Sequence, residues 1–145
     1  MYLLDTDVIS RTSPLSLGGG SRLTGWLQRH GDEAFLSVVS LTEIQYGVSR
    51  LVERGAHARA AQLQHWLNAV LARYGDRCLP LDLASARRTG ELLARAEAEG
   101  HKPSFEDASL AATAEVHQLT MVTFNARHFR AFGIPFQEPG NSVDF

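Results

Sequence analysis

The chain has 145 residues, of which 44% are hydrophobic and 21% are charged, and its formal net charge is −2. These values fit one globular domain with a substantial core, and they exclude a global electrostatic attraction for nucleic acids. Because Cys78 is the only cysteine, a disulfide framework and a cysteine zinc site are excluded. No apolar stretch approaches the roughly 18 residues of a membrane span. Met1 leads directly into an apolar strand without a charged leader, so we expect a cytoplasmic protein.

Short apolar runs alternate with segments of helical periodicity along the chain. The predicted strands cover about residues 2–5, 34–39, 77–82, 119–123 and 134–137. The predicted helices cover about residues 7–12, 42–53, 57–74, 84–99 and 105–117, and Leu23, Trp26 and Leu27 predict one more that ends at Gly31. Strands that alternate with helices predict an α/β fold, in which helices cover both faces of a central parallel sheet of four to five strands.

The chain shows no internal repeat and no domain boundary. Residues 13–21, with Gly18-Gly19-Gly20, are interpreted as a flexible loop. We expect a single domain over residues 1–139 and a frayed tail over residues 140–145.

Two of the predicted helices, 42–53 and 57–74, are separated by a short segment containing Gly55 and therefore predict a helical hairpin. The second helix carries more apolar surface than one small sheet face covers, and a leftover apolar patch marks an interface. We expect the hairpin to form a twofold dimer contact or a groove for a partner helix. The residues concerned are Ala60, Leu63, Trp66, Leu67, Val70 and Tyr74.

The first seven residues carry the most informative pattern, an apolar run that ends in Asp5-Thr6-Asp7. In open parallel sheets, ligands bind beyond the carboxyl ends of the strands. Three further polar side chains, Glu43, Asp107 and Asn125, fall at equivalent places after other strands or in a first helical turn. Oxygen ligands without His or Cys suit a hard cation such as Mg²⁺ or Mn²⁺, and converging carboxylates need one to stay ionised together. Such a cation activates water and bridges a phosphate.

Each acid also has a simpler interpretation as a helix cap. Asp5 can cap the helix that follows it. The spacing Ser40-x-x-Glu43 fits a capping box, and Ser104-x-x-Asp107 has the related pattern. Three acids at the edge of one sheet are less expected by chance than one, which favours a common site.

Other residues near these acids carry two interpretations each. Gly47 lies one turn after Glu43 and either leaves space beside the carboxylate or permits tight helix packing. Asp7 is a helix-start residue or an acid behind the site, with its side chain pointing away from that of Asp5. Six basic residues fit either contacts to RNA phosphates or a solvated face. They are Arg87, Arg88, Arg95, Lys102, Arg127 and Arg130.

Four segments, in order and spacing, resemble the motifs of PIN domains. They are Leu3-Leu4-Asp5-Thr6-Asp7-Val8-Ile9-Ser10, Ser40-Leu41-Thr42-Glu43-Ile44 with Gly47, Asp107-Ala108-Ser109-Leu110-Ala111-Ala112-Thr113-Ala114, and Leu119-Thr120-Met121-Val122-Thr123-Phe124-Asn125. The resemblance covers residues 1 to about 139. It is strongest for the VapC-type toxins of bacterial toxin–antitoxin pairs, particularly the FitB-like, plasmid-stability group.

The resemblance implies a PIN-like three-layer fold and an endoribonuclease that depends on Mg²⁺ or Mn²⁺. It implies a protein that is usually a homodimer and that a cognate antitoxin holds inactive by placing its tail in the acidic site. On this resemblance Asp5, Glu43 and Asp107 bind the metal. Asn125 stands where some members have a fourth acid, so we expect it to position water or substrate rather than to neutralise a metal.

The sequence also departs from the family pattern at Asp7, where Asn is commoner, and at His128, which replaces an Asp often found there. Two alternatives stay open. Asp5-x-Asp7 also opens haloacid-dehalogenase-like phosphatases, but that chemistry needs a downstream Lys, and Lys102 precedes a helix with no paired Asp motif after it. The other is a non-catalytic RNA-binding or antitoxin-sequestering protein that keeps the fold.

Overall fold

The computed structural model describes residues 1–18 and 20–140, and within them five parallel strands form one sheet. The predicted tail lies almost wholly outside the described residues. The strands stand side by side in the order β3-β2-β1-β4-β5. They are β1 (Tyr2–Leu4), β2 (Ala34–Ser37), β3 (Cys78–Leu79), β4 (Thr120–Val122) and β5 (Phe136–Gln137).

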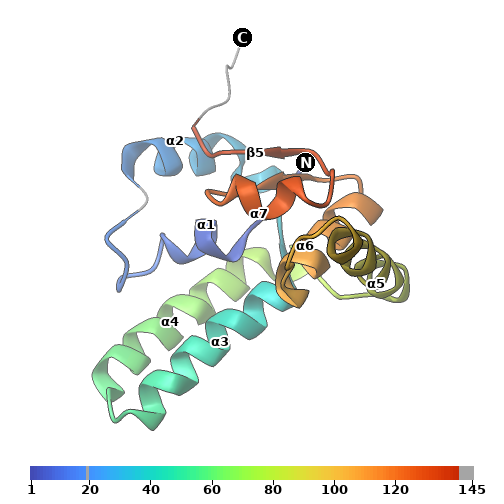
Figure 1. Ribbon diagram of the computed structural model, residues 1–145. Helices are drawn as coiled ribbons and strands as arrows, with labels where there is room; N and C mark the ends of the chain where they lie inside the picture. The colour runs from blue at the N-terminus through green and yellow to red at the C-terminus, as the bar shows by residue number, and fades with distance from the viewer. Residues whose placement is uncertain (19, 141–145) are drawn as a thin grey trace.

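Helices fill the connections between the strands, as the alternation predicts (Figure 1). They are α1 (Thr6–Ser10), α2 (Gly20–His30), α3 (Val38–Glu53), α4 (His57–Tyr74), α5 (Leu83–Ala98), α6 (Phe105–Val116) and α7 (Ala126–Arg130), with short 3₁₀ turns at Gly31–Glu33 and Gly75–Arg77. The short helix α7 was not predicted. None of the described helices is long and apolar enough to cross a membrane.

Apolar side chains cover both faces of the sheet, which confirms the predicted three-layer fold. Successive residues of a strand point to opposite faces. Leu3 belongs to a core cluster with Leu92 of α5 and Leu110 of α6, whereas Leu4 belongs to a second cluster with Trp26 of α2 and Leu67 of α4. The central strand β1 therefore joins two hydrophobic cores, one on each face of the sheet.

The direction in which the chain crosses the sheet reverses between β1 and β4. The chain first adds β2 and β3 on one side of β1, and later adds β4 and β5 on the other side. Leu4 pairs with Val122, and the backbone N–H of Asp5 donates to the carbonyl of Val122 at 2.9 Å. In open α/β sheets ligands bind in the crevice at such a reversal, beyond the carboxyl ends of the strands. This topology places a binding crevice next to Asp5.

The predicted hairpin is present as α3 and α4, which run side by side and extend away from the rest of the domain (Figure 1). Its apolar stripe is less exposed than the sequence predicts. Four of its members are buried within the chain itself: Ala60, Leu67, Val70 and Tyr74. The prediction of a wide leftover patch is therefore wrong for these residues, because α3 packs along the helix and residues of α1 and α2 share one core cluster with Leu67, Val70 and Tyr74.

On this helix Leu67 lies in the core, whereas Leu63 lies closer to the surface. Leu67 is 1% exposed, and Leu63 is only partly buried. We expect Leu67→Glu to unfold the protein, because an unpaired buried carboxylate costs more than the roughly 2–5 kcal/mol of a core Leu→Ala change. Leu63→Glu should stay folded. Thermal melts followed by circular dichroism test the pair, and a Leu67→Glu protein that melts like wild type would contradict the core assignment.

Candidate active site

Asp5 is fixed at the carboxyl end of β1 by hydrogen bonds to both carboxylate oxygens. Oδ1 accepts from the backbone N–H of Thr6 at 2.7 Å, and Oδ2 accepts from the hydroxyl of Thr123 at 2.7 Å. The same Thr123 oxygen accepts from the backbone N–H of Asn125 at 2.9 Å. Asp5 is the N-cap of α1, as the capping interpretation predicts. Capping by itself does not explain why its side chain is buried against β4.

The environment of Asp5 disfavours the ionised form of its carboxyl group. Its pKa is raised to about 8, mainly by burial and in addition by the negative charges of Asp7 and Asp107. The hydrogen bond from Thr123 opposes this effect. The influence of Asp107, which lies about a hundred residues along the chain, indicates that α6 brings this acid to the same edge of the sheet as Asp5.

Asp7 lies directly behind this acid rather than away from it. Its Oδ2 accepts from the backbone N–H of Phe124 at 3.2 Å and from Asn125 Nδ2 at 2.9 Å. Burial raises the pKa of Asp7, while the guanidinium of Arg11 lowers it. The predicted side-chain direction is wrong, because Asp7 belongs to α1 and strand alternation no longer applies there. Asp7 Oδ1 is buried and has no hydrogen-bond partner among the described residues.

Glu43 does not belong to a capping box. The helix α3 begins at Val38, four residues before the predicted start, and its N-cap is Ser37, whose hydroxyl accepts from the N–H of Val39 at 3.1 Å. Ser40 therefore lies inside the first turns of the helix, and the capping interpretation of Ser40-x-x-Glu43 is wrong. The helix starts early because β2 ends at Ser37, a short polar residue that accepts hydrogen bonds.

The Glu43 carboxylate points instead toward α1. Its Oε1 accepts from the hydroxyl of Thr6 at 2.9 Å, and that hydroxyl lies 2.8 Å from Ser40 Oγ. Burial raises the pKa of Glu43 first, followed by the charges of Glu106 and Asp107. Thr6 therefore connects the two segments that carry Asp5 and Glu43.

Gly47 leaves open space beside Glu43, one turn farther along α3. A Cβ atom added at Gly47 would meet no heavy atom within 4 Å. Gly47 and Glu43 line a hollow of about 370 Å³ together with Thr6 and Trp66. The interpretation that glycine leaves space beside the carboxylate is confirmed, and the interpretation of tight packing at this glycine is wrong.

Asp107 stands in the first turn of α6, which Ser104 caps. The Ser104 hydroxyl accepts from the backbone N–H of Asp107 at 3.0 Å, as the predicted cap pattern requires. The cap uses only the backbone of Asp107, so its carboxylate is free to face the site. Oδ2 of Asp107 lies 3.2 Å from Nδ1 of His128 in α7.

The acids supply the donor set of a hard divalent cation, but their side chains do not close around one point. Among the described residues no three His, Cys, Asp or Glu side chains are gathered closely enough to hold a metal ion. Glu43 is turned to Thr6, and Asp107 is turned to His128. The unpaired Asp7 Oδ1 and the raised pKa of Asp5 are nevertheless conditions that a cation would relieve. The residues fit such an ion in chemistry, all through oxygen.

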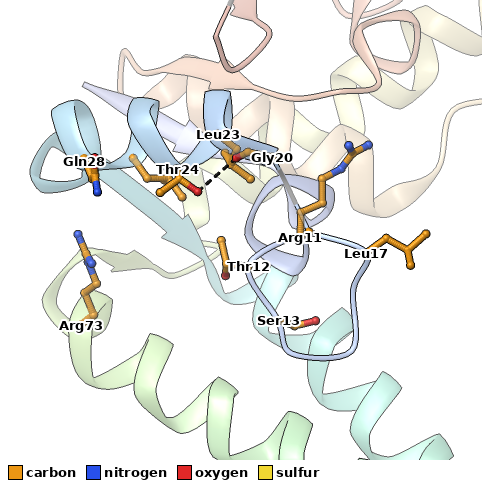
Figure 2. Close-up of a pocket in the computed structure, with 11 residues that line it drawn as sticks. Arg11, Thr12, Ser13, Leu17, Gly20, Leu23, Thr24, Gln28 and Arg73 are labelled. Atoms are coloured by element: carbon orange, nitrogen blue, oxygen red, sulfur yellow. Dashed lines mark hydrogen bonds between the residues drawn. The ribbon is translucent and has the colours of Figure 1, made fainter.

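A larger hollow, of about 690 Å³, lies beside this acidic centre. Figure 2 shows it between α2 and the loop that follows α1, with Arg11 and Arg73 on opposite sides of the view. No Asp or Glu occurs among its described lining residues. The Arg11 guanidinium lies 3.8 Å from the centre of the Phe124 ring and acts on Asp7. The size of this hollow therefore does not identify the reactive centre, which lies where the carboxylates meet.

Sequence reasoning missed three residues that act on the acids: Thr6 and Thr123 through hydrogen bonds, and Arg11 through its charge. A usable signal existed for two of them, since Thr6 directly follows the predicted acid Asp5 and Thr123 directly follows the end of β4. Arg11 has no such signal, because only the turn after α1 brings it over Phe124.

Comparisons with known proteins agree with this architecture. A toxin named FitB from Neisseria gonorrhoeae is 29% identical over 96% of this chain and 98% of that protein. A VapC ribonuclease from Sinorhizobium fredii is 28% identical over 96% of this chain and 97% of that protein. The crystal structure of FitAcB from Neisseria gonorrhoeae superposes with a TM-score of 0.83 and 29% identity, over 97% of this chain and 99% of that one.

A more distant structure, DNA-bound VapBC from Salmonella typhimurium, shares the fold with a TM-score of 0.78 at 19% identity, over 94% of this chain and 96% of that one. The family model of the PIN domain matches residues 2–134. This match includes every acid described above and spans the whole sheet except its last strand. The chain belongs to the PIN domain family.

Proposed function

We propose that this protein is the toxin of a toxin–antitoxin pair and an endoribonuclease that cleaves RNA phosphodiester bonds. Its relatives named as the toxin FitB and a VapC ribonuclease cover nearly all of the chain. The observation that carries the chemistry is the electrostatic coupling of acids from three separate segments, since Asp7 and Asp107 both raise the pKa of Asp5 and of Glu43. Acids that repel one another in one crevice are the arrangement that a metal-dependent nuclease requires.

The cation is Mg²⁺ or Mn²⁺, held by Asp5, Glu43 and Asp107. When bound, it supplies activated water and stabilises charge on the phosphate. For all three acids to face one ion, Glu43 must turn from Thr6 and Asp107 must turn from His128, both by side-chain motion within an open crevice. Asp7 adds negative charge from behind the site.

The remaining site residues hold these groups in position. Thr123 fixes Asp5 through a 2.7 Å hydrogen bond, and Asn125 holds Asp7 through its side-chain amide at 2.9 Å. Asn125 is exposed, so the other side of its amide can orient the attacking water or an RNA oxygen. Its contribution is positioning, because an amide carries no charge to offset a metal.

The protein partner is a cognate antitoxin, and the functional unit is a homodimer. The antitoxin follows from the structures of FitAcB and of FitAB bound to a DNA fragment, which match this chain at 29% and 28% identity, and the homodimer follows from the resemblance to VapC-type toxins. An RNA substrate places the protein in the cytoplasm.

Glu43→Gln is the decisive substitution for this proposal. Gln keeps the size of the side chain and can still accept from Thr6, but it loses the charge that a divalent ion needs. We expect RNA cleavage in millimolar Mg²⁺ to fall at least roughly 100-fold, since even residues that only support metal ligands cost 10- to 100-fold when changed. Cleavage of a labelled RNA by purified protein, with Mg²⁺ and with EDTA, measures the effect.

The matched control is Glu53→Gln, the same change at an exposed position near the end of the same helix. It should keep wild-type cleavage, and both variants should melt near the wild-type temperature. A folded and fully active Glu43→Gln protein would contradict the metal assignment. Wild-type protein that binds RNA without cleaving it in Mg²⁺ would favour the non-catalytic alternative, and hydrolysis of a phosphate monoester alone would favour the phosphatase.

A further inference from the structure

The structure separates the six basic residues that the sequence could not distinguish. The guanidinium of Arg88 forms ion pairs with Glu91 and Glu115, and Arg95 donates to the backbone carbonyl of Phe132 at 2.7 Å. These two arginines are committed to contacts within the fold. Four others remain as exposed cations: Arg87, Lys102, Arg127 and Arg130.

Two of these cations line the same hollow. Lys102 lies in the segment before α6, and Arg127 lies in α7, so the fold brings them together from separate parts of the chain. The hollow has a volume of about 360 Å³, and its wall includes His101, Ser104 and Asp107. Neither Lys102 nor Arg127 has an ion-pair or hydrogen-bond partner within residues 1–18 and 20–140.

The position of this hollow relative to the acids is informative. Asp107 forms part of its wall and is also one of the three proposed metal ligands, so the hollow opens directly beside the acidic centre. A polyanion that approaches four carboxylates is repelled by them. Two unpaired cations at one side of the crevice offset that repulsion where the polyanion enters. The guanidinium of Arg presents a fork of hydrogen-bond donors that matches a phosphate.

We propose that the hollow between the α6 start and α7 binds a backbone phosphate of the RNA strand next to the one that is cleaved. Lys102 and Arg127 carry the binding, and Asp107 separates this phosphate from the reactive one. This inference rests on the proposed ribonuclease function for the identity of the strand. It names positioning residues, since neither cation touches the reacting atoms.

A solvated face would explain one exposed cation, but it does not explain this pair. Two cations from separate elements face one concave surface, without counter-charges other than the acid that belongs to the site. A carboxylate-rich segment of a protein offers a similar charge. The RNA strand is favoured because its phosphates recur along the chain, so a strand held at the acidic centre necessarily places a neighbouring phosphate beside it.

The test compares two double variants that each remove two positive charges. Lys102→Gln with Arg127→Gln changes the hollow, whereas Arg54→Gln with Arg59→Gln changes exposed residues around the far end of the hairpin. Binding of a fluorescein-labelled single-stranded RNA is followed by anisotropy in EDTA over a range of salt concentrations. Counterion release predicts a salt slope shallower by about 1.4 for the hollow variant, and binding roughly 10- to 100-fold weaker near 50 mM salt.

The control variant should bind RNA as wild type does. With Mg²⁺, the hollow variant should show a raised KM and an unchanged kcat, because the phosphate contact is the same in the ground and transition states. The free energies of unfolding of both double variants should lie within about 0.5 kcal/mol of the wild-type value, since the changed side chains are exposed. Labelled oligoglutamate should not show binding that depends on Lys102 and Arg127.

The outcomes distinguish this inference from the function on which it rests. Equal RNA affinity and equal salt slopes for the two doubles would overturn the phosphate site, whether or not wild type cleaves RNA. RNA binding that depends on Lys102 and Arg127, in a wild-type protein without nuclease activity, would support the site and overturn the nuclease. Tighter binding of oligoglutamate than of RNA at this hollow would overturn it in favour of an acidic protein partner.

Discussion

Asp5→Asn is expected to abolish RNA cleavage and, in the absence of metal, to make the protein more stable at alkaline pH. A gain in stability together with a loss of activity is the response expected when a group that is unfavourable in the fold is needed for function. It follows from the environment of Asp5, which is 6% exposed and has a pKa raised to about 8 by burial and by the neighbouring acids. Asn removes the charge that this environment opposes, and that same charge is the proposed metal ligand.

The structural role of Asp5 does not predict this result. Its Oδ1 caps α1 by accepting from the N–H of Thr6, and Asn is as good an N-cap as Asp. If capping were the main role of Asp5, Asp5→Asn would retain both activity and stability. We expect cleavage to fall at least roughly 100-fold and Mn²⁺ affinity to fall by a similar factor. Calorimetric titration of Mn²⁺, RNA cleavage and thermal melts in EDTA measure the three quantities.

Asp82→Asn is the matched control, because Asp82 is the N-cap of α5 and accepts from the N–H of Ser85 at 2.8 Å. Hydrogen bonds from Ser85 lower the pKa of Asp82, the opposite of the shift at Asp5. Asp82→Asn should therefore keep full cleavage and gain no stability at alkaline pH. If Asp5→Asn behaved as this control does, the buried acid would have only its capping role.

The ends of the strands were predictable from the sequence, because a buried strand is apolar and the apolar run stops where the chain leaves the sheet. The alternation of Leu3 and Leu4 between two cores, and the placement of Asp5 just beyond them, follow from period two and from parallel topology. The same reasoning does not reach Glu43 and Asp107, which lie inside α3 and α6; the hydrogen bond of Glu43 to Thr6 and the influence of Asp107 on Asp5 relate them to this edge only in the structure. Their metal-binding role stays a prediction.

What the sequence could not supply was the direction of side chains after a strand ends. Asp7 was expected to point away from Asp5, yet the first turn of α1 brings it behind the site. The predicted start of α3 was also wrong, since Ser37 and Ser40 are both acceptable caps and the structure uses Ser37. The hydroxyl of Thr6 donates a hydrogen bond to Glu43, which lies 37 positions farther along the chain, and no local sequence pattern predicts such a contact.

The wild-type protein without metal is expected to lose stability as the pH rises, and a divalent cation is expected to reverse that loss. Asp5 has a folded-state pKa of about 8 against an unfolded value of 3.8, so between these values the folded state binds more protons than the unfolded state. The free energy of unfolding must then fall with increasing pH over this range. Raised pKa values of Asp7 and Glu43 act in the same direction.

The size of the effect follows from Asp5 alone. One pKa unit corresponds to about 1.4 kcal/mol, so from about pH 5.5 to 8.5 the loss is on the order of 2–3 kcal/mol. For a domain of this size each kcal/mol changes Tm by roughly 2–4 °C, which makes the shift readily measurable. The acids with lowered pKa values, Asp82 and Glu115, lose their contribution only at more acidic pH and do not affect this window.

Thermal melts across this pH range, in EDTA and in millimolar Mg²⁺, give the measurement. A cation that binds the folded state alone raises its stability, and it binds better once the carboxylates are ionised, so the increase in Tm from Mg²⁺ should be larger at the alkaline end. Asp5→Asn should flatten the pH dependence in EDTA and remove most of the increase. If the metal-free wild type were equally stable at both ends of the range, or if Mg²⁺ raised Tm most at acidic pH, the buried acids would not form a cation site.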